Sequence, residues 1–195
     1  ILSMTDTQQK IEYLKGLFAH TYIRDIKERY EIQKDDDLEE LISLIASNIG
    51  SLTNPTKLEN SLKSIKKSNL SRDTIKNYLD FLQDAFLIEK AIRYDIKGKK
   101  YIDTPSKYYF SDLGLRNARL DFRQTEFTHL LENTIYNELR LRGFSVDVGQ
   151  IPVVEAGEEG KRQRSILEVD FVCNQGYKRY YIQSAYSLPT EEKMK

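Results

Sequence analysis

The sequence predicts an α+β fold, and three features of its pattern support this. Apolar residues recur at helical spacing through the first half, a basic glycine-containing turn joins two β-prone runs in the middle, and strands dominate after one further helix. The chain has 195 residues, of which 39% are hydrophobic and 31% charged, as in globular proteins. This length suits one domain or two small ones.

The first half is expected to be helical. The run Asp35–Asp37 supplies an N-cap and a favourable negative charge for a helix that begins near Leu38 and ends at Gly50. Ser71 is a good N-cap for a later helix, whose apolar stripe comprises Ile75, Leu79, Leu82 and Phe86. The expected helices cover residues 11–31, 38–49, 55–64 and 72–86.

A β-ribbon is expected directly after these helices. Strands over 88–96 and 101–102 flank the turn Lys97–Lys100, and another short strand begins at Lys107. Several helices followed by a β-ribbon is the element order of a winged helix-turn-helix. In such a domain the helix over 72–86 would enter a DNA groove and the turn would form the wing.

The second half has a different character. A strong helix is expected over 128–142 with Gly143 at its C-terminal end, where a left-handed conformation is common. Strands are expected over 144–148, 151–155, 165–173 and 180–186, with a hairpin loop over 156–161. The break between the halves lies near 115–126. We therefore expect one domain over 1–115 and a second over 116–195.

Charge is distributed unevenly along a chain whose net charge is zero. Residues 1–40 hold 6 basic and 10 acidic side chains, whereas residues 57–100 hold 11 basic and 6 acidic ones. This basic bias favours an anionic partner such as DNA, and a solvated lysine-rich face or a protein-docking surface is the alternative. The candidate DNA-binding residues are Lys66, Lys67, Arg72, Lys76, Asn77, Lys97, Lys99 and Lys100, with Lys63 preceding them. Asp73, Asp80 and Asp84 share the helix and would repel phosphate.

Carboxylates of the second half fall in an order that suggests metal-dependent phosphodiester hydrolysis. Glu132 or Glu138 from the helix, Asp170 from one strand and Gln183 from the next could converge on a divalent metal such as Mg²⁺. Gln183 is a poorer magnesium ligand than a carboxylate, and Ala185 stands where a lysine would be needed. The alternative for Asp170 is a partly buried acid paired with Arg164 or Arg140.

Several classes of protein are excluded by composition. The single cysteine, Cys173, cannot form an internal disulfide and fits a reduced, cytoplasmic setting; it is expected to be a buried small hydrophobe. His20 and His129 lie far apart, so a structural zinc site is not expected. No phosphate-binding loop, membrane span or secretion signal is present in the sequence. The chain begins with Ile1 and is expected to be a piece of a longer protein.

Five stretches of the chain, taken in order, resemble one large family. They are 70–88 (LSRDTIKNYLDFLQDAFLI), 107–116 (KYYFSDLGLR), 131–139 (LENTIYNEL), 168–172 (EVDFV) and 181–186 (YIQSAY). Together they resemble the C-terminal half of prokaryotic AAA-superfamily ATPases whose ATPase core is followed by a domain of unknown function. The resemblance implies a helical connection and a winged helix up to about residue 115, and then a PD-(D/E)XK nuclease-like, restriction-endonuclease-like α/β domain truncated at its C-terminus.

The resemblance also implies a function. Its metal-site positions would be Glu132 or Glu138, Asp170 and Gln183, and the departures at Gln183 and Ala185 weigh against hydrolysis. The leading hypothesis is therefore a non-catalytic accessory module that directs an ATPase to DNA or to a protein partner; ATP and Mg²⁺ would bind only the ATPase part. A metal-dependent nuclease is the second hypothesis. The third is a protein-interaction scaffold that forms homo-oligomers.

Overall fold

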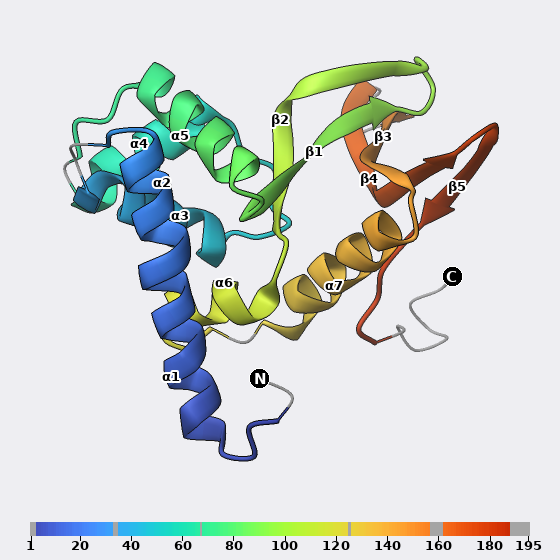
Figure 1. The fold of residues 1–195 in the computed structure, drawn as a ribbon. Coiled ribbons are helices and arrows are strands. Elements are labelled where there is room, and N and C mark those ends of the chain that lie inside the picture. The colour runs from blue at the N-terminus through green and yellow to red at the C-terminus, as the bar shows by residue number, and fades with distance from the viewer. Residues whose placement is uncertain (1–2, 33–34, 67, 125, 157–161, 188–195) are drawn as a thin grey trace. The chain divides into compact units, whose positions relative to one another are not determined.

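The computed structural model describes residues 3–32, 35–66, 68–124, 126–156 and 162–187, and it confirms a mixed α+β fold. The chain forms two compact units (Figure 1). The first unit comprises residues 1–90 and 107–125, and the second comprises 91–106 and 126–195. The chain therefore leaves the first unit, returns to it and leaves it again. Within the described residues no helix is long and apolar enough to cross a membrane.

A long helical segment opens the first unit. It comprises α1 (Thr7–Leu17), the π-helical stretch η1 (Phe18–Ile23) and α2 (Arg24–Arg29). The segment was expected as one regular helix from residue 11, but it starts earlier because the Asp6 side chain accepts a hydrogen bond from the backbone N–H of Gln9. The wider π turn brings residues five apart to one side, so Phe18 and Ile23 are both buried.

Three further helices build the core of this unit. They are α3 (Asp35–Ser47), α4 (Pro55–Lys66) and α5 (Arg72–Asp84), close to the expected ranges. Their buried residues include Leu38, Leu41, Ile42, Ile45, Leu58, Leu62, Ile75, Leu79 and Leu82. The apolar stripes predicted from helical spacing are thus the surfaces that pack together.

One short helix was not expected from the sequence. Helix α6 (Leu113–Arg119) lies in the stretch that was assigned to a turn and to the break between the halves. The Asp112 side chain caps it by accepting from the N–H of Leu115 at 3.0 Å. Arg116, only 2% exposed, donates from Nε to the carbonyl oxygen of Ala46 at 2.8 Å. Tertiary hydrogen bonds therefore hold α6 against α3.

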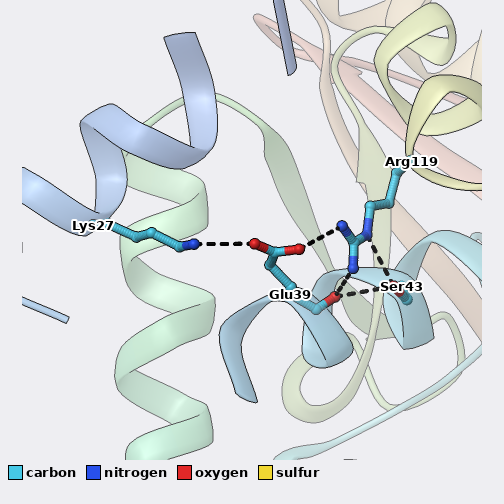
Figure 2. Close-up of polar contacts among 4 residues, drawn as sticks. All are labelled: Lys27, Glu39, Ser43 and Arg119. Atoms are coloured by element: carbon cyan, nitrogen blue, oxygen red, sulfur yellow. Dashed lines mark hydrogen bonds and ion pairs between the residues drawn. The ribbon is translucent and has the colours of Figure 1, made fainter. Parts of the chain in front are cut away.

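A polar network adds to this attachment (Figure 2). The Glu39 carboxylate accepts from Lys27 on one oxygen and from Arg119 on the other, both at 3.0 Å. Arg119 also donates to the Ser43 hydroxyl at 2.9 Å and to the Glu39 carbonyl oxygen at 2.8 Å. Burial raises the pKa of Glu39, but the hydrogen bonds from Lys27 and Arg119 outweigh it, so the pKa is lowered overall. Glu39 therefore links α2, α3 and α6 as a charged group.

The second unit is built on the sheet, whose strand order is β2-β1-β3-β4-β5. The strands are β1 (Ile88–Asp95), β2 (Lys100–Phe110), β3 (Ser145–Ala156), β4 (Arg162–Gln175) and β5 (Lys178–Ile182). β1 pairs with β3 in parallel, and β3–β4 and β4–β5 pair antiparallel. Helix α7 (Phe127–Leu141) packs on β3 and β4 (Figure 1). The ring of Tyr136 on α7 contacts that of Phe171 on β4.

Two expected strand pairs are single strands in the structure. The strands expected at 101–102 and from Lys107 both belong to β2. Residues 144–155, expected as two strands, form β3 with a register shift between Asp147 and Gly149. A Cβ on Gly149 would approach Val169, Val172 and Ile96 within 3.0 Å, so the shifted strand can pack closely only with glycine there. The last strand ends at Ile182, four residues before its expected end at Tyr186.

Candidate nucleic-acid interface

Helix α5 is positioned by a cap at its start and by apolar residues along one side. The Ser71 hydroxyl accepts from the backbone N–H of Thr74 at 3.2 Å, which confirms Ser71 as the N-cap. Ile75, Tyr78, Leu79 and Leu82 are buried. Phe86, expected in the apolar stripe, instead follows the helix with a φ of 55° and is 77% exposed. The helix therefore presents one polar side along its whole length.

The first two turns of this side carry three of the predicted DNA-binding residues. Arg72, Lys76 and Asn77 are all exposed. Arg72 approaches Asp73 at 3.5 Å, and both side chains are largely exposed, so this contact contributes little. The geometry brings two cations and an amide together on the surface of one helix.

The C-terminal half of α5 is in contact with the end of α2. The Tyr30 ring, at the end of α2, stacks on Phe81 with 3.8 Å between ring centroids, and its hydroxyl donates to the Asp84 carboxylate at 3.2 Å. Burial and Asp84 raise the pKa of Tyr30, which keeps its phenol protonated as a donor. Tyr30 thus covers the Phe81 ring, while Asp80 and Asp84 remain exposed on the same half of α5. No sequence signal pointed to Tyr30, because it lies 54 residues from Asp84.

The other predicted cations lie in different places. Lys63 pairs with Glu59 on α4 at 2.6 Å. Lys66 is the last residue of α4, and its side chain and all of Lys67 fall outside the described part of the chain. The turn residues Lys97, Lys99 and Lys100 are exposed and belong to the second unit, whereas α5 belongs to the first.

The basic turn is held in shape by local contacts. The buried Asp95 carboxylate accepts from the N–H of Gly98 at 2.8 Å, and Lys99 adopts a φ of 51°. Lys97 donates to the carbonyl oxygen of Pro152 at 3.1 Å. The turn therefore displays its lysine side chains from a fixed backbone.

The predicted nuclease-like positions of α7 differ in their surroundings. Glu132 is only 7% exposed in the second turn of α7. Glu138 lies at the surface, where its carboxylate forms an ion pair with Arg142 at 2.7 Å. Among the described residues, no group of three or more His, Cys, Asp or Glu side chains could hold a metal ion.

Asp170 and Gln183 do come together. The Asp170 N–H lies 3.4 Å from the Gln183 side-chain oxygen. However, one oxygen of the Asp170 carboxylate accepts from both the N–H and the hydroxyl of Ser184, each at 2.7 Å. Asp170 is therefore the buried, partnered acid of our alternative interpretation, but its partner is Ser184 and not Arg164 or Arg140. Mg²⁺ prefers several carboxylate or water oxygens, whereas Asp170 and Gln183 bring together one carboxylate and one amide oxygen.

Two buried groups on the strands have shifted pKa values. Burial raises the pKa of Asp147 to about 6, although Arg179 and Arg140 act to lower it. Burial raises the pKa of the Cys173 thiol to about 11, and the charge of Asp147 adds to this. Cys173 is fully buried, as expected of a small hydrophobe, and its thiol stays protonated at neutral pH.

Comparison with known proteins places the chain in a family. A family model described as "Domain of unknown function (DUF8612)" matches residues 1–126. An uncharacterized protein of Haemophilus influenzae is 36% identical over 186 residues, which cover 95% of this chain and 43% of that protein. An uncharacterized protein of Methanocaldococcus jannaschii is 31% identical over 177 residues, which cover 91% of this chain and 36% of that protein.

The chain therefore spans less than half the length of these two relatives. No solved structure matches it. Because the family model covers more than half of the residues, the chain belongs to the family of the domain of unknown function DUF8612.

Proposed function

We propose that this chain is an accessory module that binds duplex DNA through the N-terminal half of α5. The observation that carries the proposal is the position of the cations on α5. Arg72, Lys76 and Asn77 are exposed on its first turns, while Tyr30 packs on Phe81 further along. A groove-reading helix contacts DNA with the residues of its first turns, which is where these side chains lie.

The element order supports a winged-helix interpretation of this region. Helices α3, α4 and α5 are followed by β1 and β2, and α4 packs against α5. In such a domain α5 would be the recognition helix. With two cations, one amide and the exposed Asp73 on these turns, the attraction is modest, so binding should be weak and sensitive to salt.

Within this proposal, the nuclease-like part of the chain, α7 with β3, β4 and β5, has a non-catalytic role. Helix α7 followed by β3, β4 and β5 has the element order expected of that fold. Its Asp170 carboxylate is hydrogen-bonded by Ser184, and Gln183 and Ala185 stand where an acid and a lysine would be needed. An amide and a methyl group cannot stabilise an attacking hydroxide, which favours a docking or structural role.

The proposal extends to the longer protein. Relatives more than twice as long as the matched region are consistent with a module attached to other domains. The resemblance drawn from the sequence suggests that the attached part is an AAA-type ATPase, which would bring ATP and Mg²⁺ with it.

Fluorescence anisotropy of a labelled duplex tests the proposal. The double variant Arg72→Ala/Lys76→Ala should weaken binding roughly tenfold at low salt. The control Arg24→Ala/Arg29→Ala removes the same charge from the exposed surface of α2, where both side chains are more than half exposed. It should change the affinity less than about threefold. Equal losses in both variants, or no loss in the first, would overturn the proposal.

The same samples, incubated with Mg²⁺ and run on a denaturing gel, test the non-catalytic assignment. Intact strands are expected. Shortened strands that disappear in Asp170→Asn would make the second unit a nuclease, whatever the binding result for α5.

A further inference from the structure

We infer that the second unit carries a stacking site for single-stranded nucleic acid, built from Tyr94, Tyr101, Arg179 and Tyr181. These residues come from β1, β2 and β5 and were not among the residues predicted to bind nucleic acid. The site shares no residue with α5, so it goes beyond the proposed duplex binding, and either can fail alone.

Tyr94 is the centre of the cluster. Its ring is only 4% exposed, and the Tyr101 ring lies against it with 5.1 Å between centroids and 55° between planes. The Arg179 guanidinium carbon lies 4.3 Å from the centroid of the Tyr94 ring. A second aromatic ring and a cationic plane therefore both pack against the Tyr94 ring.

Hydrogen bonds fix the guanidinium in this position. Arg179 donates from Nη1 to the Tyr94 hydroxyl at 2.5 Å and from Nε to the Asn174 side-chain oxygen at 2.7 Å. Its pKa is raised, chiefly by the hydrogen bond to Tyr94. Tyr181 is two residues after Arg179 on β5, so both side chains lie on the same face of the strand. An arginine held in this way loses little further freedom when a flat ligand binds to it.

The outer members of the cluster are accessible. Tyr101 is 55% exposed, Tyr181 is 52% exposed, and Arg179 is exposed as well. Single exposed tyrosines are ordinary on a protein surface. Here the exposed Tyr101 and Arg179 both pack on the same buried ring, Tyr94, which holds them close to each other. Bases of a single strand stack on aromatic rings and on arginine planes of this kind.

The lysines next to the cluster indicate that its ligand is negatively charged. Lys97, Lys99 and Lys100 come directly before Tyr101, and residues 91–106 hold four basic and two acidic side chains. Lysines beside a stacking surface attract a phosphate backbone, which an uncharged aromatic ligand would not require. The bases of a duplex are paired and stacked on one another, and they cannot lie flat on Tyr101 unless the strand is opened. The ligand is therefore a single strand, of DNA or RNA.

Anisotropy of labelled oligothymidylate and oligouridylate, about 15 nucleotides long, measures the binding of the whole chain to each single strand. Tyr101→Ala should weaken binding of at least one of them roughly tenfold, and Tyr101→Phe should restore it because the ring is kept. Arg179→Lys should also weaken binding, since it keeps the charge and loses the plane. Tyr177→Ala is the matched control: Tyr177 is 95% exposed in the turn between β4 and β5 and should not change the affinity.

An oligomer of the same length without bases separates stacking from charge. Tyr101→Ala should leave its weak binding unchanged, whereas Lys99→Ala/Lys100→Ala should reduce it. The inference is overturned if Tyr101→Ala binds both single strands like the wild type. It is also overturned if Tyr101→Ala weakens the base-free oligomer as much as the strands with bases. Circular dichroism of each variant establishes that a loss of binding is not a loss of fold.

Discussion

Glu39 in the first unit and Asp147 in the second are both acids with two bases near them, yet their pKa values move in opposite directions. Glu39 accepts hydrogen bonds from Lys27 and Arg119, and its pKa is lowered. Burial raises the pKa of Asp147 to about 6, because Arg179 and Arg140 act on it only through their charge and lower the pKa by less. A base stabilises a buried carboxylate strongly only when it donates a hydrogen bond to it.

The difference follows from where the arginines donate. Arg119 donates hydrogen bonds to Glu39 and Ser43, so its guanidinium is part of the polar network inside the first unit. Arg179 donates to Tyr94 and Asn174 instead, and it leaves Asp147 without a direct bond from it. Side chains that serve binding are commonly placed at a cost in folding stability, and the placement of Arg179 away from the Asp147 carboxylate is of this kind. The comparison therefore favours a structural role for Arg119 and a binding role for Arg179.

The largest effect is expected from Arg119→Ala. This variant removes three hydrogen bonds, to the Glu39 carboxylate, the Ser43 hydroxyl and the Glu39 carbonyl, so at about 1 kcal/mol each it should destabilise the first unit by about 3 kcal/mol. Hydrogen exchange measured by mass spectrometry should show lost protection in α3 and α6. The control Arg123→Ala, at a side chain that is 81% exposed, should change protection little. Unchanged protection in Arg119→Ala would contradict the structural role assigned to Arg119.

Asp147→Asn should have a smaller effect of the opposite sign. The folded pKa, about 6, is above the ordinary pKa of aspartate, so the folded state binds more protons between about pH 4 and pH 6. This contribution to stability is complete below about pH 4 and is lost as the pH rises through 6. The variant should therefore stabilise the second unit by about 2 kcal/mol at pH 8 and by almost nothing at pH 4.

Urea unfolding at the two pH values checks this, with the protection of β3 and β4 assigning the effect to the second unit. Glu39 provides the internal contrast. Its lowered pKa means that its contribution is present at neutral pH and is lost as the pH falls through its folded value. Equal stabilisation by Asp147→Asn at both pH values would show that Asp147 is not the titrating group.

The smallest effect on stability is expected from Ser184→Ala. The variant removes the hydroxyl that donates to Asp170 and keeps the backbone N–H bond to the same oxygen, so it should cost about 1 kcal/mol. Thermal unfolding of the two proteins measures the difference. Stabilisation on removing the hydroxyl would mean that Ser184 does not hold Asp170 in the folded chain.

The sequence predicted those parts of the fold that depend on local chemistry. Ser71 and Gly143 are a helix cap and a left-handed helix end, as expected, and the apolar stripe of α3 is buried. The seven-residue helix α6 was missed because so short a segment is held mainly by tertiary bonds, such as that from Arg116 to α3.

The candidate sites were predicted less completely, for the same reason. The exposed cations of α5 could be read from helical periodicity, but the cover provided by Tyr30 could not. Arg179 and Tyr94 are 85 residues apart, and only the strand order brings them together. The Ser184 bond to Asp170 depends on where β5 ends, and the sequence placed that end four residues too late.

The salt dependence of duplex binding tests the central claim most directly. If Lys76 contacts phosphate, a plot of log Kd against log salt concentration should lose about one unit of slope in Lys76→Ala. Lys178→Ala, at an exposed lysine at the start of β5, should keep the slope of the wild type. Identical slopes for the wild type and Lys76→Ala would contradict the account, because the cationic half of α5 would then make no contact with DNA.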